Sequence, residues 1–496
     1  MNILKRPMLL AAVVCSIVAA ASLFIKTIAF ALLGISVLCT LVIILLKRYK
    51  YITVTFFVLL FTVSLCFQFF QIKTISVSDN KIISGKFLVI SESELYDDFN
   101  MVALKSTSSN VLPKGTKYLV FDEKKTKLKM GDIVNAKIKI SVIDNYDEYR
   151  FTNYSNGIYA TANAEKISKT DNYNVVYKSA GNIRSYVKKT ISSKFKNDTA
   201  GFLLAVTTGD KSLLSDQFLE HVKTTGISHM IVVSGMHLSI IMMAVFWCLD
   251  RLFYNKYIRA FISVMLVLSI FVVCGFTMSI TRAGAMFIVA AIAPIFNRDN
   301  DSLNSLLTAV VVVLIGAPFA IFNISFQLSV LSTLSIVWVV PFYYQRITKK
   351  FSINNKFIKL IVATVLCSVF AIIFTLPVTI KTFGFVSIIS PITNLLVTYP
   401  VNLALVLTIL SLALNVIPII KIVSFVPFRL AKWCAEFVVY IVNVLAQLPI
   451  TVAVLPKSAF WWSIVIIVLI IGNMHWYEYK KKRSDLNANS FRRRFT

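Results

Sequence analysis

The chain has 496 residues, of which 57% are hydrophobic and 15% are charged, and its mean hydropathy is +0.76. Soluble domains carry about 25% charged residues, so this composition excludes a string of soluble domains. The high apolar content also excludes a disordered chain. The sequence therefore predicts a polytopic α-helical membrane protein.

Charge is spread unevenly along the chain, whose net charge is +28. One long polar stretch, residues 71–186, holds 17 basic and 13 acidic residues, a net of +4, and the remainder holds 34 and 10, a net of +24. The apolar part is thus nearly devoid of carboxylates. Positively charged cytoplasmic loops and a path for a polyanion both account for this excess, and the two interpretations are compatible.

Residues 1–70 are predicted to form three transmembrane helices, at Pro7–Ile25, Ile28–Leu46 and Tyr51–Phe70. Each run reaches the roughly 20 residues that a spanning helix needs. Basic residues precede the first run and follow the second, so the positive-inside rule places the N-terminus in the cytoplasm. The third span then leaves residue 71 and those after it outside the cell.

Residues 71–186 are predicted to form an extracellular small β-barrel, similar to an OB-fold and inserted between membrane segments. Turn residues separate five short β-prone runs, at Lys81–Ile90, Met101–Leu104, Tyr118–Phe121, Ile133–Val142 and Ile158–Ile167. A locally basic set of side chains is either a DNA-binding face or an ordinary solvated face: Lys124, Lys125, Lys127, Lys129, Lys137 and Lys139.

The rest of the chain returns to the membrane. Residues 187–226 mix apolar positions at helical spacing with lysines, which predicts amphipathic helices on the membrane surface. Residues 227–475 are predicted to form a transmembrane domain whose first span is Ile227–Leu249, and residues 476–496 a basic tail. Two regions look interrupted, around Gly275–Gly284 and around Val386–Leu414, and Val423–Leu448 is expected to lie in the membrane interface. The C-terminus is then cytoplasmic.

One local pattern is more specific than the rest. Gly209-Asp210-Lys211-Ser212 is followed by Thr225-Gly226-Ile227-Ser228-His229 and then by Ser234-Gly235-Met236-His237. Further matches are Thr281-Arg282-Ala283, Phe326-Gln327-Leu328-Ser329, and Ser390-Pro391 with Asn394. This pattern resembles the ComEC competence-protein family, over nearly the whole chain.

The resemblance implies a channel that carries single-stranded DNA across the bacterial cytoplasmic membrane during natural transformation. It implies that the motif residues line the DNA path: Gly209, Asp210, Ser228, His229, Ser234, Gly235, His237, Arg282, Gln327, Ser329, Pro391 and Asn394. The expected partners are single-stranded DNA, the lipid bilayer, a DNA receptor outside, an ATP-driven translocase inside, a separate nuclease and further copies in an oligomer. Many family members add a metallo-β-lactamase-like nuclease domain, and this sequence has no His-x-His-x-Asp-His run, so we expect no nuclease activity.

The residues by themselves leave several roles open. His229 and His237 are either buried structural histidines, residues that line a channel, or metal ligands, although no third ligand lies nearby in the sequence. Ser234 and His237 could instead be a nucleophile and its base, although no acidic residue is at hand to orient the histidine. Arg282 has no acidic residue within fifteen positions, so it faces water, carbonyl groups or a phosphate, or reaches an interface. We expect no catalytic residue, no metal and no cofactor. The alternatives to a DNA channel are an exporter of another anionic polymer and an intramembrane hydrolase using Ser234 and His237.

Overall fold

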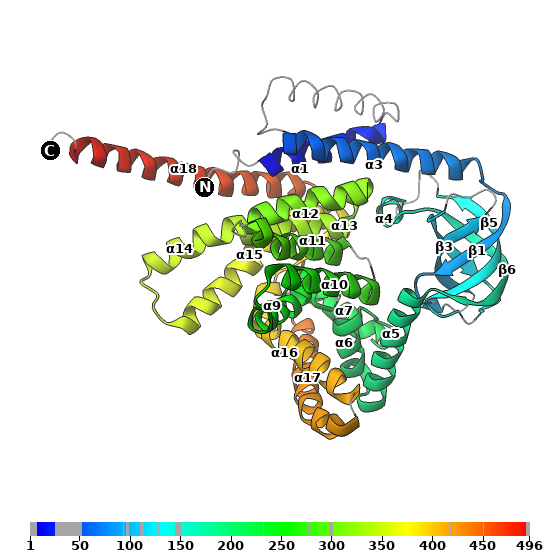
Figure 1. Cartoon of the computed structure of the whole chain (residues 1–496). Helices are drawn as coiled ribbons and strands as arrows, with labels where there is room; N and C mark the ends of the chain where they lie inside the picture. The colour runs from blue at the N-terminus through cyan, green and yellow to red at the C-terminus, as the bar shows by residue number, and fades with distance from the viewer. Residues whose placement is uncertain are drawn as a thin grey trace. The chain divides into compact units, whose positions relative to one another are not determined.

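The computed structural model shows a mostly helical chain with one small sheet domain (Figure 1). The residues that it describes are 7–24, 52–92, 94–95, 99–109, 114–126, 128–143, 150–231, 233–275, 278–296, 301–416, 418–449 and 451–492. The predicted second span, Ile28–Leu46, and Lys127 lie outside these residues. The chain divides into two compact units, which we describe separately: Met1–Leu214, Met230–Phe326 and Asn402–Ala435 form the first, and Ser215–His229, Gln327–Val401 and Glu436–Thr496 the second.

Seven helices among the described residues are long and apolar enough to cross a membrane, so the chain is a multi-pass membrane protein. They are Val54–Ser76, Gly235–Leu252, Lys256–Cys274, Ile324–Lys350, Lys356–Phe383, Ser390–Val416 and Ala459–Lys480. Three shorter apolar helices accompany them: Met8–Ala19, Ser279–Ile295 and Ser302–Gly316.

The sheet domain of the first unit has six strands: β1 (Ile82–Val89), β2 (Glu94–Leu95), β3 (Asn100–Ser109), β4 (Lys117–Asp122), β5 (Asp132–Val142) and β6 (Ile158–Tyr173). Their order is β1-β5-β6-β4-β3-β2, and β1 also pairs with β3, so the pairings of the five long strands run round and return to β1. Among these described pairings, only that of β4 with β6 is parallel.

Side-chain alternation builds the core of this domain. Along β5, Val134, Ala136 and Ile138 are buried while Lys137 and Lys139 are exposed, as a strand with one wet face requires. The five predicted strands are confirmed in place and order. β3 extends beyond Leu104 because its polar second half, rich in Ser and Thr, pairs with β1, a tertiary contact that no local apolar alternation signals.

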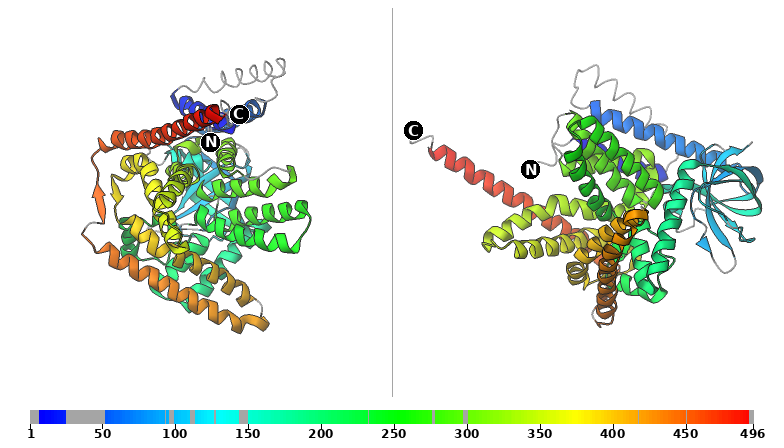
Figure 2. Two further views of the ribbon diagram at one scale, coloured as in Figure 1. Left: turned by 90° about the vertical axis from the view of Figure 1, so that its left-hand side faces the viewer. Right: turned by 60° about the horizontal axis from the view of Figure 1, so that its bottom comes forward.

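The helical part of the first unit is a set of neighbouring helices. α1 packs on α3 and α12, α12 on α11, and α11 on α9 and α10 (Figures 1 and 2). The bounds in this unit are α1 (Pro7–Phe24), α3 (Ile52–Ser76), α4 (Arg150–Ser155), α5 (Val175–Lys194), α6 (Asn197–Thr208), α9 (Gly235–Leu252), α10 (Lys256–Cys274), α11 (Met278–Ile292), η3 (Ala293–Phe296), α12 (Ser302–Gly316), η4 (Pro318–Phe322) and η6 (Pro418–Ser424). Gly284 allows α11 to approach α10 closely, since a Cβ there would lie 2.2 Å from Phe271 Cζ.

The predicted membrane-surface helices turn out differently. α5 keeps an amphipathic pattern, with Ala180, Val187 and Ile191 on its buried face. α6, by contrast, is buried nearly all round, from Ala200 to Val206. Gly201 lets it pack tightly, because a Cβ at Gly201 would lie 2.6 Å from the Leu213 carbonyl oxygen. A helix covered on all sides belongs to a packed core, and not to a membrane surface.

The second unit contains α7 (Asp216–Thr224), η5 (Ser335–Val339), α14 (Val340–Lys350), α15 (Lys356–Phe383), β7 (Phe385–Ser387), β8 (Val452–Val454) and α18 (Ala459–Arg492). In four helices the division between the two units falls inside the helix, so that each has residues in both: α8 (Ser228–Ile231), α13 (Ile324–Leu334), α16 (Ser390–Val416) and α17 (Phe425–Ala446). Val339, Phe370, Phe374 and Met474 form the apolar core of the second unit, and β7 pairs antiparallel with β8.

Two predicted boundaries were wrong. α16 runs without a break from Ser390 to Val416, because Pro391 falls in its first turn, where a missing N–H is harmless, and Pro400 is accommodated inside the helix. The predicted span Ile227–Leu249 is not one helix, since α8 ends at Ile231 and α9 begins at Gly235. The break near Gly275 lies between α10 and α11, so Arg282 sits inside a regular helix.

Candidate functional site

The Gly209–Asp210 motif is a helix end held by an ion pair. Gly209 closes α6 in the left-handed conformation, with φ of +81°, which glycine adopts without strain. The Asp210 carboxylate accepts a 3.0 Å hydrogen bond from Lys188 Nζ and a 2.8 Å bond from the Ser212 backbone N–H. Burial raises the pKa of Asp210, but the hydrogen bonds from Ser212 and Lys188 outweigh burial and hold that pKa below its usual range. Asp210 therefore fixes the turn as an ionised group.

The Thr225–Gly226 motif is a second helix end, at the close of α7. The Ile227 N–H donates to the Val222 carbonyl at 3.1 Å, and Gly226 has φ of +77°. A Cβ on Gly226 would lie 2.7 Å from Ser390 Cβ and 2.8 Å from Ser387 Cβ. The structure thus brings Gly226, just before Ser228 and His229, against the Ser390-Pro391 motif that begins α16.

Asn394 extends this polar contact within the second unit. Its amide nitrogen lies 3.2 Å from Ser368 Oγ and 3.4 Å from Ser390 Oγ, and its side chain is 8% exposed. Asn394 Oδ1 and Ser387 Oγ are buried without a hydrogen-bond partner among the described residues. Buried oxygens are normally hydrogen-bonded, so both atoms have unused capacity to accept a further hydrogen bond.

Ser234 and His237 meet at the start of α9, in the first unit. Ser234 is the N-cap residue, and its backbone N–H lies 3.4 Å from Nδ1 of the fully buried His237 ring. The histidine three residues after the cap thus reaches back to the chain, as in a capping box. Nδ1 is engaged with the backbone and not with the Ser234 hydroxyl, which is the geometry of a helix start. His229 lies before the break, so it and His237 do not share one helix face.

Gly235 and Arg282 are in direct contact. Arg282, on α11, is 5% exposed, and a Cβ on Gly235 would lie 2.9 Å from its Nη2 atom and 3.2 Å from Ala283 Cβ. Arg282 Nη1 also lies 3.2 Å from Met286 Sδ. The missing side chain of Gly235 therefore makes the room in which the guanidinium lies. Around it, Val233, Leu238, Phe271 and Ile280 belong to one apolar core.

The remaining motif residues are less concentrated. Gln327 and Ser329 lie half-buried on α13, where the Ser329 carbonyl accepts a 2.8 Å hydrogen bond from Thr333 Oγ1. Among the described residues, no group of three His, Cys, Asp or Glu side chains could hold a metal ion. The motif residues therefore fall into separate clusters: Gly209–Asp210, Ser234–Gly235–His237–Arg282, and Gly226 with Ser390 and Asn394.

The predicted basic residues of the sheet domain lie on its outside. Lys125, Lys129, Lys137 and Lys139 are exposed. Lys124 Nζ donates to the Glu165 carbonyl at 2.8 Å, and Lys137 lies 3.4 Å from the Glu165 carboxylate. The tyrosines Tyr118 and Tyr154 are buried and serve the core, so they are not free to stack on bases.

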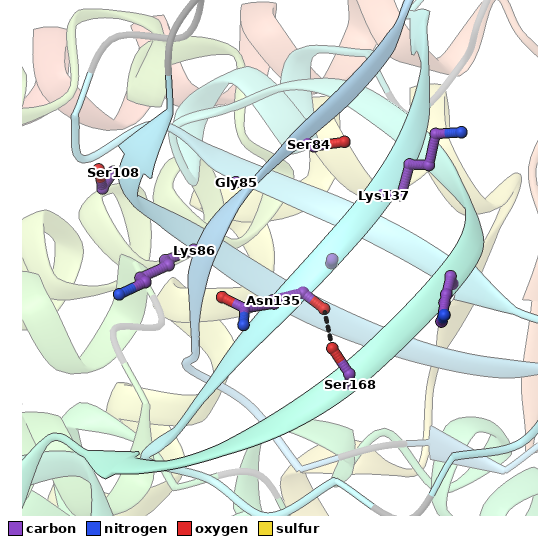
Figure 3. Close-up of a pocket in the computed structure, with 9 residues that line it drawn as sticks. Ser84, Gly85, Lys86, Ser108, Asn135, Lys137 and Ser168 are labelled. Atoms are coloured by element: carbon purple, nitrogen blue, oxygen red, sulfur yellow. Dashed lines mark hydrogen bonds between the residues drawn. The ribbon is translucent and has the colours of Figure 1, made fainter.

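Sequence reasoning missed Lys86 and Lys166, which with Lys137 border an open hollow of about 500 Å³ (Figure 3). Each of these two lysines lies in its own strand, outside the lysine-rich run of residues 124–139. Only the register of the strands brings them beside Lys137.

The chain is thus a multi-pass membrane protein with one sheet domain and with polar motifs that contain glycine, around Gly209, Gly226 and Gly235, among its helices. Residues 206–480, more than half of the chain, match the protein family described as Competence protein, so the chain belongs to that family. It is also similar to the ComE operon protein 3 of Bacillus subtilis (strain 168), with 25% identity over 193 residues. That match covers 39% of this chain and 24% of the relative. The chain therefore matches about a quarter of the relative's length. No solved structure matches the chain.

Proposed function

We propose that the chain is a channel that carries single-stranded DNA across the bacterial cytoplasmic membrane in competence. The family match over residues 206–480 contains every motif of the helical part, from Gly209 to Asn394. Within those motifs, the contact between Gly235 and Arg282 carries the proposal. A guanidinium kept at 5% exposure among apolar helices is expensive, and buried ionisable groups in membrane segments mark ligand pathways.

Arg282 suits a phosphodiester in its chemistry. Its planar, permanently charged head group can donate two parallel hydrogen bonds to a phosphate. The guanidinium lies against Gly235 at the start of α9, whose first N–H groups add positive potential that favours an anion. The clusters around Gly226 and Asn394 supply neutral polar groups. They contain no carboxylate, a group that would repel a polyanion.

For the sheet domain we propose an OB-fold. Five long strands with ring-like pairing, closed by β1 with β3 and with one parallel pair, have the connectivity of a five-stranded Greek-key barrel. OB-folds hold single strands by backbone and stacking contacts, which fits a receiving domain for DNA. Along the chain we propose the five parts predicted from the sequence, at residues 1–70, 71–186, 187–226, 227–475 and 476–496.

We further propose that the sheet domain faces the outside and that both ends of the chain face the cytoplasm. A cysteine introduced at Ser108 should react with an impermeant maleimide in intact cells, and one at Asn489 only after permeabilisation, with the native cysteines replaced by serine. Labelling of Asn489 in intact cells would make α17 a span and reverse the C-terminal side. A DNA receptor outside and an ATP-driven translocase and nuclease elsewhere complete the proposed system.

Uptake of labelled DNA by cells tests the function, with Gly235→Leu as the variant. The larger side chain collides with Arg282 and Ala283, so uptake should fall at least tenfold while the protein still inserts in the membrane. Gly472→Leu is the matched control, because nothing lies within 4 Å of a Cβ at that helical glycine, and it should leave uptake unchanged.

Each alternative gives a different result in the same cells. Normal uptake by Gly235→Leu at normal protein level would remove the contact from the path. Unchanged uptake on deleting the gene, with loss of an anionic polymer from the cell surface, would favour an exporter. Release of product from single-stranded DNA or a peptide by the pure chain, abolished by Ser234→Ala, would favour a hydrolase.

A further inference from the structure

A hollow with a short polar floor and a lysine border lies on the outer face of β1, β5 and β6. Its lining residues are Ser84, Gly85, Lys86, Ser108, Asn135, Ala136, Lys137, Lys166 and Ser168. Figure 3 shows Lys86 and Lys137 extending on opposite sides of Asn135, whose carbonyl oxygen accepts a 3.2 Å hydrogen bond from Ser168 Oγ. The hollow forms because residues with small side chains, such as Ser84 and Ser168, lie between the long side chains of the lysines.

Strand register sets the spacing of the three lysines. Lys137 lies directly opposite Lys166 on β6, and Lys86 lies opposite Asn135, which makes it a diagonal neighbour of Lys137. Directly opposed residues have Cβ atoms about 5 Å apart, and diagonal ones about 7–8 Å. Three ammonium groups therefore follow one path across neighbouring strands.

This arrangement works against the folding of the sheet. Like charges directly opposite each other on a sheet are destabilising. Glu165 lies 3.4 Å from Lys137 and offsets one charge, which leaves the hollow with a net positive charge. A local charge conflict of this kind is typical of a site whose ligand supplies the missing opposite charge.

Two β-bulges flank the hollow. One interrupts the pairing of β1 with β3 between Lys86 and Phe87, and the other interrupts that of β5 with β6 between Lys137 and Ile138. Bulges re-aim side chains and are frequent beside functional sites. The extra residues are Thr107 on β3 and Glu165 on β6, which lie across from Lys86 and Lys137, so both irregularities fall at the edge of the hollow.

The chemistry of the lining points to a phosphate backbone and not to bases. The nine lining residues include no aromatic side chain, and serine, asparagine and lysine are donors that suit phosphate oxygens. On the proposed function as a channel for single-stranded DNA, we propose that this hollow binds the sugar–phosphate backbone of the strand without regard to sequence. Lys86, Lys137 and Lys166 are its cationic contacts.

Binding of a fluorescent oligothymidine to the purified full chain in detergent, measured over a range of salt concentrations, tests this. The triple variant Lys86→Gln, Lys137→Gln and Lys166→Gln should bind at least tenfold more weakly at low salt. The slope of log affinity against log salt should become shallower by about 2, since each lost phosphate contact removes about 0.7. The control triple variant Lys114→Gln, Lys125→Gln and Lys129→Gln has the same charge change at exposed positions outside the hollow. Lys125 and Lys129 belong to the lysine-rich run that the sequence offered as a DNA-binding face, so this variant also tests that rival site, and it should lose far less binding.

Two further measurements distinguish binding of the backbone from binding of the bases and from damage to the fold. An oligomer of the same length without bases should bind the wild-type chain nearly as well as oligothymidine, because the hollow contacts the backbone. Thermal unfolding of the Lys166→Gln variant should be unchanged or occur at higher temperature, because the like-charge pair is removed. Weaker binding with a lower unfolding temperature would indicate structural damage and overturn the assignment.

The outcomes also separate this inference from the channel. If the control triple variant loses binding and the hollow variant does not, the proposal that the hollow binds DNA is wrong. The proposal that the sheet domain binds DNA is then still supported. If both variants bind normally but Gly235→Leu abolishes uptake, the channel stands without this site. If cells take up DNA equally with and without the gene, the proposed function itself fails.

Discussion

Positive charge appears in two physically different settings in this chain. Arg282 is one guanidinium packed on Gly235 inside an apolar core, whereas Lys86, Lys137 and Lys166 are exposed ammonium groups on a sheet. A charge acts far more strongly where the surroundings are apolar than in water, where salt screens it within about 10 Å. The buried site should therefore depend on one residue and be insensitive to salt, while the exposed one should be additive and sensitive to salt.

The largest expected effect is that of Arg282→Glu. The substitution places a negative charge in the buried site, where it repels a phosphate and is itself costly to bury. DNA uptake should fall below a hundredth of the wild-type level. Uptake of labelled DNA and immunoblotting of the membrane fraction are the measurements.

Two companion variants sharpen this contrast. Arg282→Lys keeps the charge but loses the planar fork, so uptake should lie between the wild type and Arg282→Glu. Arg251→Glu reverses an exposed charge on α9 and should change uptake less than threefold. If Arg282→Glu is present in the membrane and takes up DNA normally, the buried guanidinium has no part in the path.

A second prediction concerns the buried polar contact of the second unit. Gly226→Ala meets both an unfavourable positive φ and two serine Cβ atoms within 3 Å, so the free energy of unfolding should fall by roughly 3 kcal/mol. Gly384→Ala meets a similar φ of +72° but nothing within 4 Å, and should cost about 1 kcal/mol. Thermal unfolding in detergent compares the two, and equal losses would show that the contact with Ser387 and Ser390 adds nothing.

The smallest effect is expected at the ion pair of Asp210, which is largely buried, and Lys188, which is exposed to water. Asp210→Asn should lower the free energy of unfolding by less than about 1 kcal/mol near neutral pH, because the lysine is solvated and screened. The pKa of Asp210 is lowered in the folded chain, so its contribution is present above the usual carboxyl pKa of about 3.9 and is lost as pH falls through the lower, folded value.

Thermal unfolding of the wild type and Asp210→Asn from pH 7 down to pH 3 checks this sign. The difference between the two proteins should shrink as the pH is lowered. A difference that grows toward acid would mean that Asp210 is held protonated, contrary to its contacts with Lys188 and Ser212.

The sequence-based prediction of the strands was accurate, and that of the breaks between the later helices was only partly so. Strands β1, β4 and β5 follow the predicted runs within a residue or two, because apolar alternation and turn residues are local signals. One predicted interruption was misplaced, because Pro391 and Pro400 lie within α16. Another was missed, because the predicted span Ile227–Leu249 is divided between α8 and α9. Proline and serine both mark a helix boundary in a sequence. Neither residue shows by itself whether a helix begins or ends there.

The sequence by itself determined the class of protein, the strands of the sheet domain and the residues of the motif, since hydrophobic length, alternation and residue type are written in order along the chain. Only the tertiary structure decided which of those residues meet. Gly235 lies against Arg282, and Gly226 against Ser390, over 47 and 164 positions of chain. Lys86, Lys137 and Lys166 share one face through strand register. Contacts at such separations depend on how helices and strands pack, and no local pattern of residues encodes that packing.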